Sequence, residues 1–534
     1  MSRLADFTSK DFIEQISVLN AMVENKEFDS IPGLISLMET IPVSDAVGLV
    51  IRDTLKSLLS ASEECTAGCF ASGNREVRTM CIEVAGQRRF ASAASAIRDM
   101  AGQAAAENDH GMLFIILSSL AQLDPQGSLD LFRKHLGHED PSIASLCIRM
   151  TGVLADAASF DCLCRIVVEA GSDENYEECS LETASAIESL GEFKSEKAVR
   201  FLVSQIHHRN PAARRLIHHE LVEIGNDAVK PLSVIFSEAD PDRKVLAANV
   251  LGLIGTREAG NVLVAAMDKG LAGDLNIRFA VYDALGRIPG MKSLVCLTDG
   301  LQERDEMVLT AVVSSLGKQY NPWIIDRIIE FMGKDSPHGQ ALTRAIIASR
   351  SLDIFEALYL ADETIGSRLV GEIVRTGDRE LADVFQERLK KMNTGRSQAD
   401  ISLLKGVSTP EKKIRVLAVD DSRAMLNFYS SILSETGIGL ATACNGKEAL
   451  DLLLAGDEYH LVITDMNMPV MDGIELTRQM RSQPALAGIP VVMVTTESGH
   501  SQEGLARKAG VTAFLRKPFS AEKLRKMIET CRKP

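Results

Sequence analysis

The sequence predicts two architectures in one chain: an all-α solenoid of stacked helix pairs, and an α/β domain with a doubly wound, five-stranded parallel sheet. In the first four hundred residues, an apolar residue followed by glycine recurs every 30 to 34 residues. After residue 413, short apolar runs alternate with amphipathic stretches, as expected of βα units. A chain of 534 residues is also too long for one compact core.

The domain boundaries follow from the points where these patterns change. We expect a solenoid over residues 1–393, which begins with a capping helix over residues 1–26. A linker should span residues 394–412, and the α/β domain should span residues 413–534. The linker is polar and is expected to hold no more than a helical turn near residues 401–404.

The repeat in the first region has a start signal and a stop signal. An Asp-Pro or Asn-Pro pair stands at residues 140–141, 210–211 and 240–241. The short polar side chain caps a helix, and proline fits its first turn. Each apolar helix then closes at a glycine that we expect in the left-handed conformation: Gly191, Gly225, Gly255, Gly286 and Gly317. Two helices in a period of about 30–35 residues indicate an α-solenoid.

The clearest copy of the repeat, residues 240–269, resembles the short HEAT-like repeats. The matching residues are Asp240, Pro241, Ala247, Leu251, Gly252, Ile254 and Gly255. Looser matching places about ten or eleven units over residues 27–393. The resemblance implies a curved surface that binds another protein, whose identity the sequence does not reveal.

Two enzymatic functions of HEAT-like proteins are weaker alternatives. Some are di-iron hydroxylases with four His-Glu pairs, whereas this chain has two, His138-Glu139 and His219-Glu220, at positions that are not equivalent in the repeat. Others are bilin lyases, but no residue here marks a chromophore site. Both alternatives are therefore disfavoured.

One basic cluster interrupts the acidic first region. It consists of His207, His208, Arg209, Arg214, Arg215, His218 and His219. The simpler interpretation is a solvated rim between helices. The alternative is a docking site for an acidic surface or a phosphate.

Charge and cysteine usage exclude several functions. Residues 1–413 carry 44 basic and 59 acidic side chains, whereas the rest of the chain carries 14 of each. Such an acidic surface repels nucleic acid, so we expect no nucleic-acid partner. No apolar run reaches the ~18 residues that span a bilayer, and the N-terminus lacks a signal pattern, so we expect a cytoplasmic protein without membrane insertion. The ten cysteines form no CxxC pair and are expected to be reduced thiols rather than metal ligands.

The second region predicts five βα units. We expect strands at residues 414–419, 440–443, 461–464, 491–494 and 512–515. Amphipathic helices should cover residues 422–435, 446–455, 472–482, 500–508 and 520–531. In a doubly wound sheet the functional site lies at the carboxyl ends of the strands.

Reactive side chains stand at those strand ends: Asp420, Asp421, Asp465, Thr495 and Lys517. Three crowded carboxylates repel one another, and Mg²⁺, which prefers oxygen ligands, would relieve the repulsion. Phosphoryl transfer requires an in-line nucleophile, a metal and a cation on the equatorial oxygens, and a hydroxyl donor. Asp465, the metal with Lys517, and Thr495 would supply these.

Residues 414–534 resemble the receiver domains of bacterial two-component response regulators, and most closely those of the stand-alone chemotaxis type. The matching stretches are residues 419–422, 464–473, 493–497 and 517–519. The resemblance implies that Asp465 is phosphorylated and that Mg²⁺ is held by Asp421, Asp465 and the backbone carbonyl of Asn467, with Asp420 acting through water. It also implies a switch formed by Thr495 and Phe514, and a cis peptide at Lys517-Pro518.

The function implied is that of a response regulator in a two-component or chemotaxis-like phosphorelay. A separate histidine kinase would donate the phosphoryl group to Asp465, since no kinase domain is visible, and phosphorylation would modulate the protein interactions of the solenoid. The alternative is a phosphate sink that the solenoid docks to a kinase or receptor complex. In either case we expect no enzymatic activity beyond the receiver's own phosphorylation and dephosphorylation, and no cofactor other than Mg²⁺.

Overall fold

The computed structural model describes residues 4, 6–172, 179–238, 240–333, 336–407, 414–433, 436, 438–456, 458–495 and 500–531. Its contacts divide the chain into two units. The first comprises Met1–Glu169 and Ser180–Phe193, and the second comprises Ala170–Cys179 and Lys194–Pro534. The second unit therefore holds both the later helical repeats and the α/β domain.

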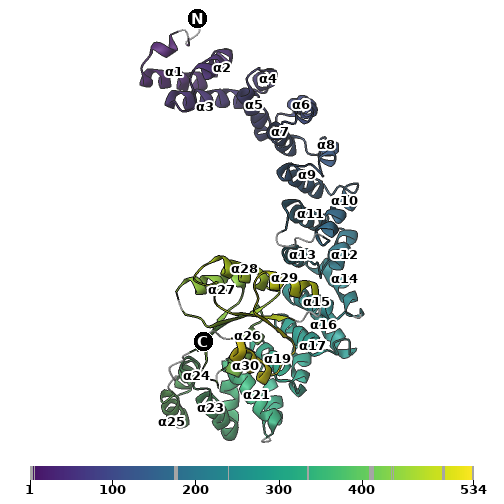
Figure 1. Cartoon of the computed structure of the whole chain (residues 1–534), viewed down its shortest axis with the longest axis vertical. Helices are drawn as coiled ribbons and strands as arrows, with labels where there is room; N and C mark the ends of the chain where they lie inside the picture. The colour runs from purple at the N-terminus through teal and green to yellow at the C-terminus, as the bar shows by residue number, and fades with distance from the viewer. Residues whose placement is uncertain are drawn as a thin grey trace. The chain divides into compact units, whose positions relative to one another are not determined.

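The first unit is entirely helical in its described part. Short 3₁₀ segments lie at η1 (Phe7–Ser9), η2 (Phe28–Ser30) and η3 (Ala91–Ala93). The α-helices are α1 (Phe12–Glu24), α2 (Ile31–Thr40), α3 (Ala46–Ala61), α4 (Glu63–Gly68), α5 (Arg75–Arg88), α6 (Ala94–Ala106), α7 (His110–Leu123), α8 (Leu129–Lys134), α9 (Pro141–Val153), α10 (Phe160–Ala170) and α11 (Leu181–Glu192) (Figure 1).

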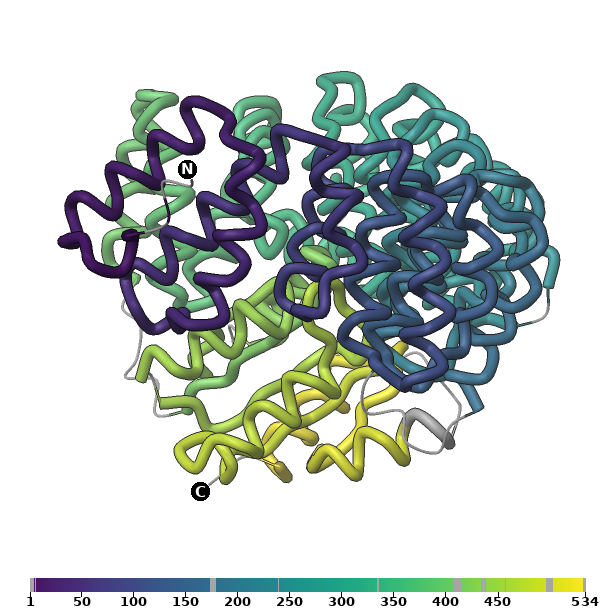
Figure 2. The backbone as a smooth tube through the Cα atoms, turned by 90° about the horizontal axis from the view of Figure 1, so that it is seen from above, coloured from purple at the N-terminus to yellow at the C-terminus, as the bar shows by residue number. Residues whose placement is uncertain are grey.

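The second unit continues the repeat. Its helices are α12 (Glu196–Ser204), α13 (Pro211–Ile224), α14 (Asn226–Ile235), α15 (Pro241–Ile254), α16 (Arg257–Asp268), α17 (Leu275–Leu285), α18 (Met291–Asp299), η4 (Gly300–Gln302), α19 (Glu306–Lys318), α20 (Ile324–Met332), α21 (Pro337–Ala348), α22 (Leu352–Ala361), α23 (Glu363–Thr376), α24 (Arg379–Met392) and α25 (Gly395–Lys405). The odd-numbered helices from α13 to α25 pack successively on one another and form one row. The even-numbered helices form a second row, in which α12, α14, α16 and α18 pack in succession, as do α20, α22 and α24. Two stacked rows make a solenoid, and Figure 2 shows the chain running back and forth between them.

The predicted start signals are confirmed. Asp140 accepts hydrogen bonds from the backbone N–H groups of Ser142 and Ile143, and Asp240 accepts the equivalent pair from Asp242 and Arg243. Asn210 caps α13 in the same way, and proline occupies the first turn of all three helices. The local sequence therefore determines where these helices begin.

The predicted glycine stops are confirmed in part. Gly225 and Gly255 follow α13 and α15 with positive φ values of 68° and 72°. The prediction is wrong for Gly191 and Gly317, which lie within α11 and α19, and for Gly286, which ends α17 with a right-handed backbone.

A close approach between repeats explains two of these exceptions. A Cβ atom added at Gly286 would lie 2.3 Å from the Oγ of Ser315, and one at Gly317 would lie 2.3 Å from the Oγ of Ser351. Gly286 brings α19, the next helix of the odd-numbered row, close, and Gly317 brings the start of α22 close. Their lack of a side chain, rather than their backbone freedom, is what the repeat requires.

The segment expected to be a polar linker contains a full helix. Helix α25 covers Gly395–Lys405, and Thr394 and Ser397 form a capping box at its start. It packs on α23 and α24, buries Leu404, and places Asp400 2.6 Å from the hydroxyl of Tyr359. The expectation of a single helical turn is therefore wrong, because α25 closes the odd-numbered row. The domain boundaries themselves remain a prediction.

The α/β domain has the predicted sheet. Its strands are β1 (Ile414–Val419), β2 (Ile438–Ala443), β3 (Leu461–Asp465), β4 (Val491–Thr495) and β5 (Ala513–Arg516), all parallel, in the order β2-β1-β3-β4-β5. The helices are α26 (Arg423–Leu433), α27 (Gly446–Leu454), α28 (Gly473–Ser482), α29 (His500–Lys508) and α30 (Ala521–Cys531). The fold class predicted from the alternating pattern is confirmed.

Two further expectations concern thiols and membranes. None of the ten cysteines, all of which lie among the described residues, forms a disulfide. No helix in the described part of the chain is long and apolar enough to cross a bilayer.

Candidate functional site

Parallel strands bring the predicted site residues to one edge of the sheet. Asp465 ends β3 and Thr495 ends β4, while Asp420 and Lys517 directly follow β1 and β5. Because β1 and β3 are neighbours, their carboxyl ends present Asp420 and Asp465 side by side. The topology therefore assembles residues that lie almost a hundred positions apart.

Lys517 joins the two aspartates. Its Nζ donates to the Oδ1 of Asp465 at 2.7 Å and to the Oδ2 of Asp420 at 3.0 Å. All three side chains are buried or nearly so. The peptide between Lys517 and Pro518 is cis, as expected.

Backbone groups hold the remaining carboxylate oxygens. The N–H of Asn467 donates to the Oδ2 of Asp465 at 2.8 Å, and the N–H of Ser422 donates to the Oδ1 of Asp420 at 2.9 Å. Gly473 lies directly behind the site, where an added Cβ would come within 2.2 Å of the carbonyl oxygen of Asp465. The turn that follows β3 therefore requires glycine at this position.

The site has more negative charge than Lys517 balances. Burial, with the neighbouring Asp465 and Asp421, raises the pKa of Asp420 to about 8 although Lys517 opposes the shift. Burial and the charge of Asp465 also raise the pKa of Asp421 to about 6. Burial acts to lower the pKa of Lys517, but Asp420 and Asp465 outweigh it and hold that pKa well above its usual value. A divalent cation with oxygen ligands would remove this imbalance.

The residues present fit Mg²⁺ by their chemistry. Asp420, Asp421 and Asp465 supply hard carboxylate oxygens, and the Asn467 backbone lies beside them. In the part of the chain that the structure describes, no three His, Cys, Asp or Glu side chains are grouped so that they could hold a metal ion by themselves. A site with few protein ligands suits Mg²⁺, because this ion keeps several waters.

The two predicted switch residues lie at the end of β4 and on the neighbouring strand β5. Thr495 is buried, and its Oγ1 lies 3.9 Å from the Sδ of Met466. Phe514 is half-buried, and the Arg507 guanidinium lies over its ring at 5.0 Å. Their role as a switch remains a prediction.

The solenoid also lines this site, which no pattern in the sequence predicts directly. A cavity of about 60 Å³ is bounded by Asp420, Asp421, Asp465 and Lys517, and also by the solenoid residues Val245, Leu246, Asn249, Asn276, Phe279, Ala280, Asp283 and Arg287. The Nδ2 of Asn276 donates to the carbonyl oxygen of Lys517 at 3.0 Å. Helices α15 and α17 therefore form part of the site.

The basic cluster is the sequence signal for this contact. On α13, Arg214 donates to the side-chain oxygen of Asn467, and Arg215 forms an ion pair with Asp472. Asn467 and Asp472 follow β3 on the turn that carries Asp465. The interpretation of the cluster as a dock for an acidic surface is thus supported, and the surface belongs to the same chain.

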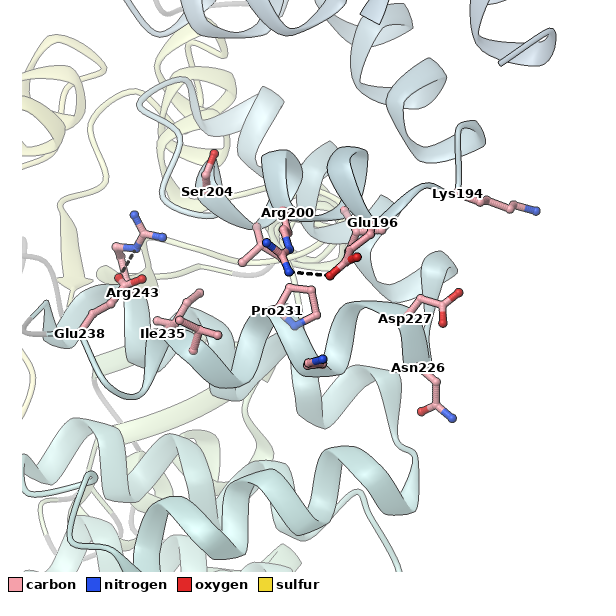
Figure 3. A pocket seen from close by; sticks show the side chains of 14 residues that line it. Lys194, Glu196, Arg200, Ser204, Asn226, Asp227, Pro231, Ile235, Glu238 and Arg243 are labelled. Atoms are coloured by element: carbon pink, nitrogen blue, oxygen red, sulfur yellow. Dashed lines mark hydrogen bonds and ion pairs between the residues drawn. The ribbon is translucent and has the colours of Figure 1, made fainter. Parts of the chain in front are cut away.

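A larger hollow elsewhere holds none of the predicted site residues. It measures about 780 Å³ and lies along α12 and α14, where Arg200 pairs with Glu196 (Figure 3). Its walls mix apolar residues with exposed charges and contain no buried acid–base pair. The carboxylate site is therefore the stronger candidate.

Comparisons with known proteins agree with the two-part architecture. The family described as "Response regulator receiver domain" matches residues 416–529, and the family described as "HEAT repeats" matches residues 229–317. A chemotaxis protein CheY homolog of Campylobacter jejuni is 37% identical over 117 residues, which cover 22% of this chain and 90% of that protein. Chemotaxis protein CheY1 of Helicobacter pylori is also 37% identical over 117 residues, covering 22% of this chain and 94% of that protein.

Solved structures give a similar result. The chemotaxis protein CheY4 of Vibrio cholerae is 35% identical and covers 22% of this chain and 98% of its own, with a TM-score of 0.22. The matched parts of the Campylobacter and Helicobacter proteins, 90% and 94% of their length, thus correspond to 22% of this chain. Through that part, the chain belongs to the response regulator receiver family, and its receiver domain follows HEAT repeats.

Proposed function

We propose that this response regulator accepts a phosphoryl group on Asp465 from a separate histidine kinase. The observation that carries the proposal is the position of Lys517, whose ammonium group contacts Asp465 at 2.7 Å and Asp420 at 3.0 Å. A buried carboxylate beside a fixed cation and a second acid is suited to phosphoryl transfer, which depends on positioning and charge stabilisation.

In the proposed step, a carboxylate oxygen of Asp465 forms a bond to phosphorus while the bond between phosphorus and the donor's imidazole nitrogen breaks. The imidazole leaves with the electron pair of that bond and takes up a proton. Lys517 is placed to pair with an equatorial oxygen of the transferred group. Mg²⁺, held by Asp421, Asp465 and the Asn467 carbonyl with Asp420 acting through water, would supply further charge neutralisation when bound.

The output proposed is a change in protein binding by the HEAT-like solenoid. Thr495, at the end of β4, would turn toward the phosphoryl group, and Phe514 on the neighbouring strand would move inward. The direct contacts of α13, α15 and α17 with the site support the solenoid, rather than an unknown further element, as the responding part.

Phosphorylation can be tested by intact mass after incubation with acetyl phosphate and Mg²⁺. We expect the mass of one added phosphoryl group on the wild-type chain and none on Asp465→Asn. Asp451→Asn is the matched control, because this aspartate on α27 is exposed and pairs with Lys447 at 2.8 Å. Equal addition to wild type and Asp465→Asn would refute the assignment of Asp465.

A further inference from the structure

The receiver's site edge and its helix α26 both pack on the odd-numbered row of the solenoid. Helix α26 packs on α19 and α21, where the Asn427 Nδ2 donates to the Ser314 Oγ at 3.3 Å (Figure 1). Helices α13, α15 and α17 lie at the strand ends that carry Asp465. The contact is therefore continuous from α26 to the phosphoacceptor.

The polar contacts lie on both sides of Asp465. Arg214 reaches Asn467, two residues after Asp465, and Arg215 reaches Asp472 at the start of α28. On the other side, Asn276 binds the backbone carbonyl of Lys517 at 3.0 Å. Arg214 and Asp472 are buried by this contact, so it excludes water from the rim of the site.

The space between the receiver and these helices is small. The cavity at the site measures about 60 Å³, which a few water molecules fill. A phosphoryl group that is still attached to a side chain of a donor protein requires more room. A phosphohistidine on the surface of a kinase would also have to pass Phe279 and Ala280, which close the cavity on the solenoid side.

The charged solenoid side chains at the cavity pair with one another. Arg287 donates to the Asp283 Oδ2 at 2.6 Å, and the Nζ of Lys318 lies 3.4 Å from the Oδ1 of Asp283. Asp283 and Arg287 both line the cavity, so their charges offset one another there. The limited space therefore disfavours a phosphorylated Asp465 beneath these helices.

We propose that α13, α15 and α17 form a cover over Asp465, that phosphodonors reach this residue only when the receiver moves off the cover, and that phosphorylation favours the uncovered state. The proposal rests on the proposed function, because it takes Asp465 as the phosphoacceptor. By linkage, whatever weakens the cover must strengthen binding of a phosphoryl analogue at Asp465 by the same factor.

Charge reversal in the cover tests access. In Arg215→Glu the new carboxylate faces Asp472, and acetyl phosphate with Mg²⁺ should label this chain about tenfold faster than the wild type. Arg200→Glu is the matched control: it makes the same charge change on α12, where the residue pairs with the exposed Glu196 (Figure 3), and it should label at the wild-type rate. Asn276→Ala removes only the hydrogen bond to the Lys517 carbonyl and should accelerate labelling to a smaller extent. This milder variant keeps the test valid if Arg215→Glu fails to fold.

The outcomes separate this proposal from the proposed function. If wild type and Arg215→Glu are labelled at the same rate and Asp465→Asn is not labelled, the cover proposal is refuted and the assignment of Asp465 stands. A failure of every variant to be labelled would overturn both proposals.

Hydrogen exchange tests the response to phosphorylation. With Mg²⁺ and beryllofluoride, peptides of α15 and α17 in the wild-type chain should exchange faster, and those of Asp465→Asn should not change. Slower exchange would show that the cover closes on the phosphoryl group and would overturn the proposed direction.

Discussion

Two buried aspartates in different parts of the molecule are held in opposite ways. Asp156, after α9 in the first unit, accepts from the Arg133 Nε at 2.8 Å and from the Ser159 hydroxyl and backbone N–H at 2.5 and 3.1 Å. These partners, led by Arg133, hold its pKa well below the usual value. Asp420 in the receiver is equally buried, yet burial raises its pKa to about 8.

The difference shows how a structural acid can be told from a functional one. Asp156 has an arginine and a hydroxyl of its own, so its charge stabilises the fold. Asp420 shares one lysine with Asp465 and lies near Asp421. No side chain therefore balances its negative charge alone, and an added cation would do so. The pKa directions therefore agree with a structural role for Asp156 and with the role proposed for the receiver site.

The largest expected effect comes from breaking the structural site. Asp156→Asn weakens the charged hydrogen bonds from Arg133 and Ser159 and should lower the local free energy of unfolding by about 2.5 kcal/mol. The measurement is hydrogen exchange of peptides covering α8 and α9. The depressed pKa implies that this stabilisation is present above about pH 4 and is lost as the pH falls below it, so the two chains should converge in acid.

A control for this prediction uses the same arginine. Asp130 also pairs with Arg133, at 2.7 Å, but its side chain is 94% exposed. Asp130→Asn should therefore cost less than about 0.5 kcal/mol. Equal losses in the two variants would show that burial does not distinguish these partners.

The sequence predicts local features of the receiver and of the solenoid, but it does not predict the contact between these two parts. Asp420, Asp465, Thr495 and Lys517 were identified because each follows an apolar run, and a parallel sheet brings strand ends together. The capping residues at the helix starts of the solenoid are local signals of the same kind. Nothing local shows that Asn276 would reach Lys517, 241 positions away.

The errors have physical causes as well. Gly286 was interpreted as a left-handed stop, but its role is to admit Ser315 of the next helix, a contact that only the stacked repeat creates. Helix α25 is polar in sequence and gains its stability by packing on α23 and α24. In both cases tertiary packing, rather than local preference, decides the structure.

A third group, the partly buried His218, sharpens the comparison because its hydrogen bond is to a neutral carbonyl. His218 on α13 donates from its Nε2 to the carbonyl of Ile206 at 2.8 Å, and burial lowers its pKa to about 4. A pKa below the unfolded value of 6.5 means that the neutral form stabilises the fold above that pH and that the stability is lost as the pH falls toward 4. We expect a loss of about 2 kcal/mol over this window.

Urea denaturation of the chain between pH 4 and 7 measures this loss, with His218→Gln for comparison. Glutamine keeps a donor for the Ile206 carbonyl but does not titrate, so the pH dependence should flatten. Replacement of the neighbouring, exposed His219 by glutamine should leave the dependence unchanged. A slope that persists in His218→Gln would assign it to other groups.

The smallest expected effect has the opposite sign and lies in the receiver. Asp420→Asn removes a buried acid whose ionised form burial and the two nearby carboxylates disfavour, while the Lys517–Asp465 pair remains. With the metal chelated at pH 7.5, the free energy of unfolding of the receiver should rise by about 1 kcal/mol. Mg²⁺ should then stabilise the wild type more than the variant, because binding to the folded state adds to its stability. The exposed control Asp451→Asn should change neither value, and a loss of stability in Asp420→Asn would mean that this acid, like Asp156, is structural.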